Sequence, residues 1–370
     1  MRPPAKSESM DTLTHALSGA LLARALTRSA PAPRDPKRGR WFGPAVPVGH
    51  AVAVGFFAAA FPDTDFALRF VSDLAYLRGH RGVTHSIVML PLWALLLGVL
   101  FAMVARRREA WMRDAWLSAA AIGIHIAGDW ITQFGTMLFA PLSDARFGLG
   151  ATFIIDLMLS AILVAGLVAS ALLPRSRAPA LVALALLPAW VGLSYSAKQD
   201  AIAFARDYAA RAALRVGFID AAPRPASPFN WTVVVFDGER YHVAHVNTRR
   251  TEPLVATADD HFIRRYSAPY QPLAQARWER LPMFGGAADE ALAREVWTHP
   301  DFAFFRWFAM FPLVERVDNG PRETCVWYRD LRFVLPGRDA APFRYGMCRG
   351  SGGAWTLYAL DDVLGRTLVR

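Results

Sequence analysis

The sequence has few charged residues for its length, and it lacks the patterns that mark a nucleic-acid-binding protein. Of its 370 residues, 19% are charged and 54% are hydrophobic, and the mean hydropathy is positive. This composition excludes an ordinary soluble domain over the whole chain. The net charge of +10 is scattered through loops, with no basic helix and no recognised nucleic-acid motif. We therefore expect no nucleic-acid partner.

A cleavable signal peptide and internal repeats are also not evident. The segment after Met10 lacks a clean apolar core and a small-residue cleavage site, so we expect the helices themselves to anchor the chain. Internal repeats and broken helices with polar groups at the bilayer midplane are typical of transporters. No repeat is visible here, which favours other functions, although an ion-coupled transporter with a structural metal site remains an alternative.

Apolar runs crowd residues 12–196, whereas the rest of the chain is mixed, Arg-rich and aromatic. We predict a membrane-embedded metal-site domain over 1–198 and a soluble α+β domain over 199–370. The expected fold is a mainly α membrane bundle of about five to six helices with a β-rich C-terminal domain. Several helices are marginal against the ~20 residues that span a bilayer, and the first could lie partly in the interface. The predicted helices are 12–28, 45–61, 85–105, 115–134, 152–173 and 179–196.

The distribution of arginine and lysine predicts an orientation in the membrane. Alternate loops carry eleven cations and the opposite loops carry six, so both termini and the soluble domain are expected outside the cytoplasm. The richer loops hold Arg28, Arg34, Lys37, Arg38, Arg40, Arg106, Arg107, Arg108, Arg113, Arg175 and Arg177. The opposite side holds Arg2, Lys6, Arg69, Arg78, Arg81 and Arg146.

Histidines and aspartates interrupt these apolar helices, where polar groups are costly and usually mark a functional site. With the predicted topology, they fall near the outer ends of five helices. All are residue types that bind metals, and His125 and Asp129 lie four apart on one helix face. The predicted metal ligands are His15, Asp63, Asp65, His80, His85, His125, Asp129 and Asp156.

Each motif also has a structural explanation. Thr14-His15 could be a cap and a satisfied histidine, and Pro62-Asp63-Thr64-Asp65 could simply end a helix. Thr84 can cap the third helix, and Gly82 permits a tight turn. His125-x-x-x-Asp129 gives the strongest signal, because a carboxylate inside the apolar stretch 119–131 requires a partner or a cation.

These ligand types predict a catalytic divalent metal, one or two ions. Zinc suits histidine with aspartate, and manganese or iron is compatible. Such an ion lowers the pKa of a bound water toward ~7. Three residues are assigned catalytic roles as hypotheses: Asp63 or Asp65 would orient a ligand or act as general base, and Arg81 would neutralise a phosphate oxygen. In a two-metal site, Asp129 would be the bridge.

The order of these motifs resembles bacterial inner-membrane proteins described as metal-dependent hydrolases, a family with a LexA-regulated member. The resemblance covers residues 11–173 and runs from Thr14-His15 to Phe153-Ile154-Ile155-Asp156; its most specific element is His80-Arg81-Gly82-Val83-Thr84-His85-Ser86. The region after residue 200 also resembles longer members, through Phe229-Asn230-Trp231 and Tyr328-Arg329-Asp330-Leu331-Arg332-Phe333. The resemblance implies a membrane hydrolase without defining its substrate.

A more distant similarity concerns zinc-dependent phospholipase C and the S1/P1-type nucleases. Their donor order is similar to His15, Asp63 or Asp65, His85, and His125 with Asp129. The later histidine and His-x-x-x-Glu that complete a third metal position in those enzymes have no counterpart here. We expect hydrolysis of a phosphoester or lipid-linked substrate, with membrane lipids as partners. A non-catalytic binding or regulatory membrane protein is the alternative, and the sequence does not define the oligomeric state.

In the C-terminal region we predict strands at 231–236, 241–246, 325–328, 331–335, 343–348 and 355–360, with a hairpin at Asp237-Gly238. His242 and His245 lie three apart on a strand and therefore face opposite ways, which disfavours a metal site. Cys325 and Cys348 form a disulfide only if their strands are neighbours. The sequence leaves that pairing open.

Overall fold

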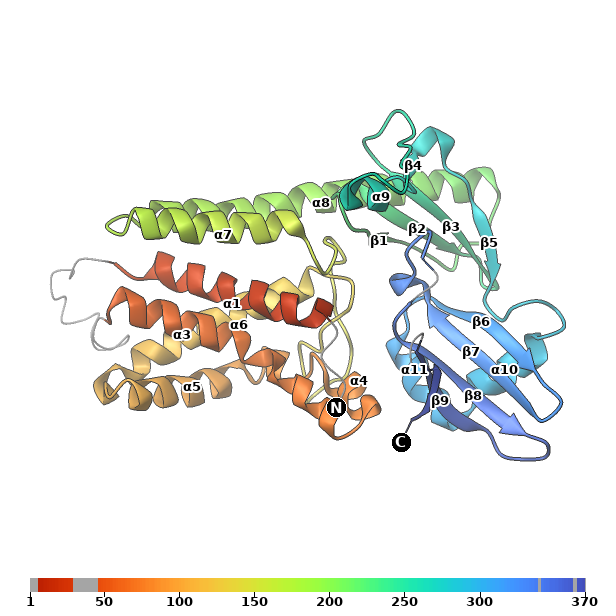
Figure 1. Ribbon diagram of the computed structural model, residues 1–370, viewed down its shortest axis with the longest axis horizontal. Coiled ribbons are helices and arrows are strands. Elements are labelled where there is room, and N and C mark those ends of the chain that lie inside the picture. Colours follow the sequence, from red (N-terminus) through yellow and green to blue (C-terminus); the bar gives the residue numbers. More distant parts are fainter. Residues whose placement is uncertain (1–5, 29–45, 339–340, 362–364, 370) are drawn as a thin grey trace. The chain divides into compact units, whose positions relative to one another are not determined.

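The computed structural model describes residues 6–28, 46–338, 341–361 and 365–369 (Figure 1). The chain divides into two compact units: one comprises residues up to 71 together with 75–195, and the other comprises 72–74 and the residues from 196 onward. The first unit is helical and the second contains two sheets. The predicted helical N-terminal half and β-rich C-terminal half are confirmed.

The helices of the first unit differ from the predicted ones mainly at their ends. Pro91 in the first turn of α5 makes Leu90 the start of that helix, since proline is favoured there. Of the preceding residues that were expected as helix, His85 ends the short η2 (83–85) and residues 87–89 form a turn. The elements are α1 (Lys6–Leu26), α3 (Val48–Ala60), η1 (Pro62–Phe70), α4 (Asp73–Gly79), η2 (Val83–His85), α5 (Leu90–Val104), η3 (Arg108–Ala110), α6 (Trp111–Trp130), α7 (Leu157–Leu172) and α8 (Ala178–Arg211).

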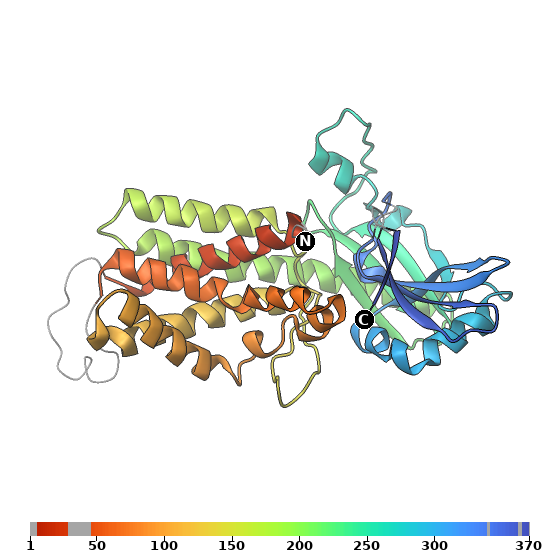
Figure 2. The same cartoon turned by 60° about the horizontal axis from the view of Figure 1, so that its bottom comes forward.

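Helices α1, α3 and α6 pack against one another and run side by side in both views (Figures 1 and 2). Their closest approach pairs Gly19 of α1 with Gly55 of α3. A Cβ on Gly19 would lie 2.2 Å from the Gly55 carbonyl oxygen, and a Cβ on Gly55 would lie 2.4 Å from that of Gly19. Small residues allow such contact between membrane helices. This contact fixes the position of α1 and of His15, which it carries.

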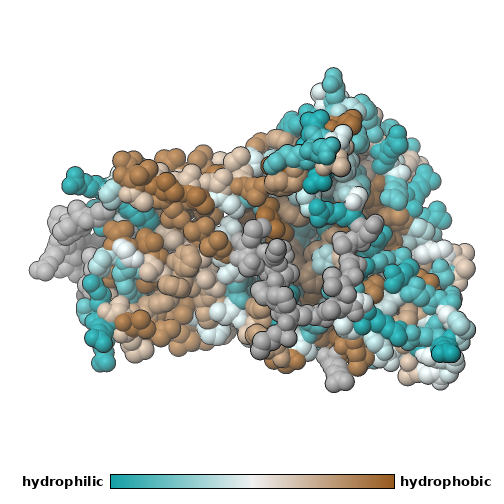
Figure 3. All heavy atoms as spheres, viewed as in Figure 1, coloured by the Kyte–Doolittle hydropathy of each residue, from teal (hydrophilic) through white to brown (hydrophobic). Residues whose placement is uncertain are grey.

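The face of the helical unit that is seen in Figure 3 is largely apolar. Leu96 of α5, Val168 of α7 and Val182 of α8 are each more than half exposed. Within the described residues, only α8 is long and apolar enough to cross a membrane alone, or up to three spans exist if each bent helix pair counts as one. Helices α3, α5 and α7 have 13, 15 and 16 residues. A bundle of five to six spans therefore stays a prediction.

Helix α8 continues to Arg211, well beyond the predicted end at residue 196. Its second half buries alanines on the first sheet of the second unit, against Trp231 and neighbouring valines. Alanines 197, 201, 205 and 209 recur every four residues and form this face. The first sheet has the order β1-β2-β3-β4, with β5 also paired to β3. Its strands are β1 (Phe218–Pro223), β2 (Asn230–Phe236), β3 (Arg240–Asn247), β4 (Gln271–Pro272) and β5 (Glu279–Pro282).

The second sheet is antiparallel, in the order β10-β9-β8-β7-β6. A second core joins Phe311, Leu313 and Leu331 to the far face of the first sheet. The strands are β6 (Pro312–Asn319), β7 (Glu323–Asp330), β8 (Arg344–Gly350), β9 (Thr356–Asp361) and β10 (Gly365–Leu368). The accompanying helices are α9 (Phe262–Ser267), η4 (Leu273–Gln275), α10 (Glu290–Thr298), η5 (Pro300–Phe302), α11 (Ala303–Phe308) and η6 (Leu331–Phe333).

Two strand predictions can be judged directly. The hairpin at Asp237-Gly238 is confirmed, with β2 and β3 antiparallel and Gly238 at φ +106°. The predicted strand at 331–335 is wrong: its first three residues form η6. The Asp330 carboxylate causes this change, because it accepts hydrogen bonds from the backbone N–H and the Nε of Arg332 and caps the helical turn.

His242 and His245 on β3 have different partners. His242 bonds Tyr208 through Nδ1 (2.9 Å) and Asp237 through Nε2 (3.1 Å). His245 bonds the Thr232 hydroxyl (2.9 Å). Burial and the nearby Arg224 guanidinium lower the pKa of His245 to about 4, so it is neutral at pH 7. These contacts assign both imidazoles to the packing of the first sheet.

Cys325 and Cys348 form a disulfide between β7 and β8. The two cysteines stand directly opposite each other in the register of the antiparallel pair, with Cα atoms 4.1 Å apart. The bridge is buried, and the Arg366 guanidinium contacts both sulfur atoms at 3.5 Å. The sequence left the pairing of Cys325 with Cys348 open, and the structure shows that they are disulfide-bonded.

Candidate metal centre

Two aspartates enter the site from η1, which begins at Pro62 directly after α3. A 3-10 helix has three residues per turn, so side chains two apart point in different directions. Asp63 points to the imidazoles of His85 (3.6 Å) and His125 (3.7 Å). Asp65 instead contacts His80 and the backbone of Arg81. The two carboxylates that the sequence could not distinguish thus have different surroundings.

His125 and Asp129 lie one turn apart at the C-terminal end of α6, and both are buried. The Nδ1 of His125 donates to the Ala59 carbonyl oxygen at 2.6 Å, which fixes the ring and turns its Nε2 toward Asp129 (3.4 Å). Binding one ring nitrogen to a backbone carbonyl leaves the other to bind a metal. Helix α3, which ends at Ala60, therefore orients a side chain of α6.

His15 reaches the same point from α1. Its Nε2 lies 3.2 Å from Oδ1 of Asp129, and its ring centroid lies 4.0 Å from that of His125. Room for this ring depends on Gly128, where a Cβ would lie 2.8 Å from Cε1 of His15. A glycine on α6 therefore makes space for the His15 imidazole carried by α1.

His85 enters from η2, and Asp65 holds its ring. Nδ1 of His85 lies 3.3 Å from Oδ2 of Asp65 and 3.0 Å from the Thr84 hydroxyl. Nε2 of His85 faces Oδ2 of Asp129 at 3.1 Å. This carboxylate–imidazole arrangement, with the second nitrogen directed inward, is typical of metal-ligating histidines.

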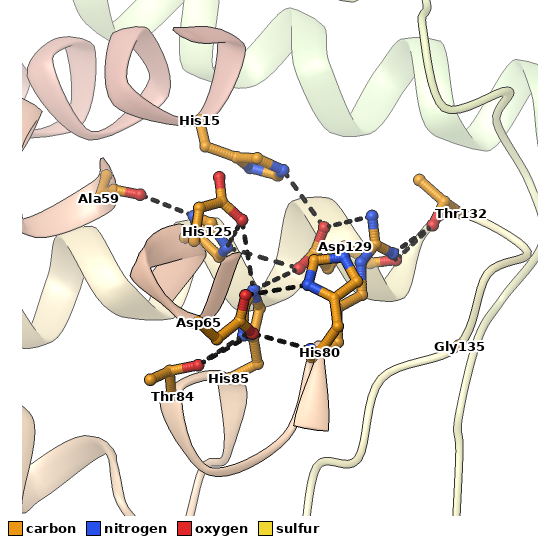
Figure 4. A network of polar contacts seen from close by, with 12 residues as sticks. His15, Ala59, Asp65, His80, Thr84, His85, His125, Asp129, Thr132 and Gly135 are labelled. Carbon is orange, nitrogen blue, oxygen red and sulfur yellow. Dashed lines mark hydrogen bonds and ion pairs between the residues drawn. The ribbon is translucent and has the colours of Figure 1, made fainter. Parts of the chain in front are cut away.

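Four buried polar atoms of Asp63, His85, His125 and Asp129 have no hydrogen-bond partner within the described part of the chain, although Figure 4 draws ion-pair contacts between these aspartates and histidines. The four atoms are Oδ2 of Asp63, Nε2 of His85, Nε2 of His125 and Oδ2 of Asp129. Two overlapping sets of donor atoms, each within 4.8 Å of one another, include His15, His125 and Asp129 in one and Asp63, His85 and His125 in the other. Buried polar atoms without hydrogen bonds are rare and need an explanation.

The surrounding electrostatics favour a cation. Helices α3 and α6 both end at the site, and the C-terminal end of a helix carries partial negative charge. The donors are imidazole nitrogens and carboxylate oxygens, which suit zinc and are compatible with manganese or iron. The side chain of Asp63 is 17% exposed, whereas those of His85 and His125 are fully buried. Access from outside is therefore from the Asp63 side.

The other predicted ligands lie apart from this donor set. His80 bonds Asp65 through Nδ1 (2.9 Å) and stacks on Tyr76. Asp156 caps α7 by accepting from the backbone N–H groups of Met158 and Leu159, and its other oxygen accepts from Trp190. Sequence reasoning did not identify Gly128 or the Ala59 carbonyl. A glycine directly before Asp129, on the helix that carries both His125 and Asp129, was the available signal for Gly128.

We expect Gly128→Ala to weaken divalent metal binding by about 10-fold or more, because the new methyl group displaces the His15 ring. Gly123→Ala is the matched control on the same helix, since its Cβ would meet only Leu90 at 4.0 Å. The measurement is a competition titration of detergent-purified protein with a zinc chelator. Equal affinities for the two variants would contradict the proposed placement of His15.

Comparisons with known proteins identify the helical half. The family model described as YdjM inner membrane protein matches residues 10–201, about half of the chain, and this match contains every candidate donor. The uncharacterized protein YfhP of Bacillus subtilis is 27% identical over 143 residues, which cover 38% of this chain and 40% of that protein. The match thus spans less than half of that relative, and no solved structure matches. The chain belongs to the YdjM inner membrane protein family.

Proposed function

We propose that this protein is a multi-pass inner-membrane hydrolase that uses a divalent metal to cleave a phosphoester or lipid-linked substrate. The observation that carries the proposal is the convergence of buried nitrogen and oxygen atoms that have no hydrogen bonds and come from separate elements. Leaving such groups unsatisfied costs about 1–3 kcal/mol each, and more for charged groups. A bound cation removes this cost.

His15, Asp63, His85, His125 and Asp129 would hold the ion. When bound, it supplies Lewis acidity and makes a hydroxide nucleophile available near pH 7. The protein's own part is to orient the donors: Asp65 fixes His85, and the Ala59 carbonyl fixes His125. The Asp63 carboxylate is more exposed than that of Asp129 and lies where a substrate would enter. Asp63 is therefore the candidate proton acceptor.

The substrate class follows from the surroundings of the site. The segments that carry the donors also expose large apolar side chains, including Phe70 (76%) at the end of η1 and Ile87 (46%) just after η2. Exposed apolar groups beside a buried polar cluster suit a substrate with a lipid portion. The similarity of the donor order to phospholipase C and S1/P1-type nucleases supports cleavage of a phosphoester.

We also propose that the C-terminal domain lies in the periplasm. The loop charges favour that orientation, and the Cys325–Cys348 disulfide supports it, because such bonds persist in oxidising compartments. A reporter fused to the C-terminus tests the orientation. Activity of a cytoplasm-dependent reporter would reject it and would move the metal site to the inner leaflet.

The test of function combines metal analysis of detergent-purified protein with a panel of phosphodiesters and phospholipids. We expect hydrolysis of at least one lipid phosphoester, a loss of about 100-fold or more in Asp63→Asn, and retained activity in Asp156→Asn. Asp156 is a suitable control because it caps α7. Metal retention without turnover of any substrate would favour a binding or regulatory protein.

A further inference from the structure

Arg81 is a buried arginine in the middle of the candidate centre. Its side chain is 2% exposed, and Nη2 lies 2.9 Å from Oδ1 of Asp129. Nη1 donates to the Thr132 hydroxyl at 2.9 Å and approaches the Asp129 carbonyl oxygen at 3.4 Å. The guanidinium also lies over the Phe134 ring, 4.9 Å from its centroid. A full positive charge therefore stands directly beside the donor atoms.

The backbone at Arg81 holds this charge in place. Its φ is +57°, a left-handed conformation that is unfavourable for residues other than glycine. Hydrogen bonds on both sides maintain it: the Arg81 N–H donates to Asp65 at 2.9 Å, and the Arg81 carbonyl accepts from Met137 at 2.9 Å. A strained residue that its surroundings fix in this way is typical of functional sites.

The two carboxylate oxygens of Asp129 have different contact partners. Oδ1 faces Arg81 and His15, whereas Oδ2 faces His85 and His125. A carboxylate that bridges two metal ions commonly directs one oxygen at each ion. One oxygen of Asp129 is already bonded to a guanidinium, so the bridging role expected for a two-metal site is filled by a fixed cation.

The sum of the formal charges at the centre also favours a single metal ion. Asp63, Asp65 and Asp129 contribute three negative charges, Arg81 contributes one positive charge, and histidines that bind a metal are neutral. A single divalent ion brings this buried cluster to neutrality. A second ion would leave two uncompensated positive charges, which is costly away from water.

Taking the metal centre of the proposed function as given, we propose that it binds one ion, and that the Arg81 guanidinium occupies the position of a second cation on Asp129. Arg81 is then a positioning residue for Asp129. This role replaces the contact with a substrate phosphate that the sequence suggested, because the buried guanidinium is bonded to Asp129 and Thr132.

Metal stoichiometry tests this proposal without an activity assay. Detergent-purified full-length protein, reconstituted with excess Mn²⁺ and desalted, is expected to retain one ion per chain and to give an uncoupled EPR signal. Two ions per chain with an exchange-coupled signal would overturn the single-ion proposal and leave the metal centre intact. No retained ion, with Mn²⁺ or with Zn²⁺, would overturn both proposals.

Substitutions of Arg81 add a second readout. Arg81→Gln removes the charge and frees Oδ1 of Asp129, so retained metal should rise from one ion toward two at high Mn²⁺; Arg81→Lys should stay at one. Arg146→Gln is the matched control, since Arg146 contacts the same Phe134 ring but donates to the backbone carbonyls of Leu77, His80 and Gly135. A folded Arg81→Gln that still binds one ion would contradict the role of Arg81. If this variant fails to fold, the wild-type EPR signal decides.

Discussion

His125→Ala and Asp129→Ala are each expected to lose bound metal while the protein remains folded and inserted. Both side chains are buried at the centre, and Asp129 contacts His15, His85 and Arg81. Loss of a residue that only orients a ligand lowers metal affinity by roughly 10–100-fold, so loss of a ligand should exceed that range. Metal analysis after membrane extraction and desalting measures the effect.

The chain offers a matched control for these variants. His50 of α3 and Asp114 of α6 form a separate, partly buried imidazole–carboxylate pair, with contacts of 2.9 and 3.0 Å. Asp114→Asn weakens this pair, so it should lower stability without releasing metal. If His125→Ala and Asp129→Ala keep a full complement of metal, or if Asp114→Asn loses it equally, the assigned donor set is wrong.

Replacing Cys325 and Cys348 together by serine is expected to destabilise the second unit by about 3 kcal/mol. The bridge closes a loop between residues 23 apart, and the value follows from the chain entropy that such a crosslink removes from the unfolded state. Chemical denaturation of the full-length protein, followed by tryptophan fluorescence, gives the free energy of unfolding.

A reductant distinguishes the loss of stability caused by breaking the disulfide from other effects of the serine substitutions. Dithiothreitol should lower the denaturation midpoint of the wild type and leave that of the serine variant unchanged. Thiol labelling of denatured protein provides an independent measurement. Two free thiols in protein isolated without reductant would show that the bridge does not form in the cell.

Much of the donor set was predictable because membrane-like sequence penalises polar side chains. His15, His85, His125 and Asp129 interrupt apolar or helical segments, and the structure brings them together with Asp63. Asp156 follows the same composition rule but caps a helix. Composition identifies a polar residue at a helix end; only the fold shows whether that residue faces the site or its own helix.

Other features depended on local geometry that the pattern did not specify. Asp63 and Asp65 could not be distinguished, because their directions depend on a 3-10 turn after α3. The end of α8 was missed because the prediction followed hydropathy, whereas alanines 197, 201, 205 and 209 continue the helical period in a polar segment. The positioning role proposed for Arg81 could not be inferred from the sequence, because it depends on a left-handed backbone and on contacts with α6.

The position of the donors along the chain has a consequence for biosynthesis. All candidate metal ligands precede residue 130: His15, Asp63, His85, His125 and Asp129. The segment that follows α6 makes a hydrogen bond to the turn that holds Arg81, because the Met137 N–H donates to the Arg81 carbonyl oxygen. Translation proceeds from the N-terminus, so the ribosome has delivered every donor before it makes that segment or the sheets. A nascent chain could therefore bind the proposed ion during membrane insertion, before the C-terminal domain and its disulfide exist.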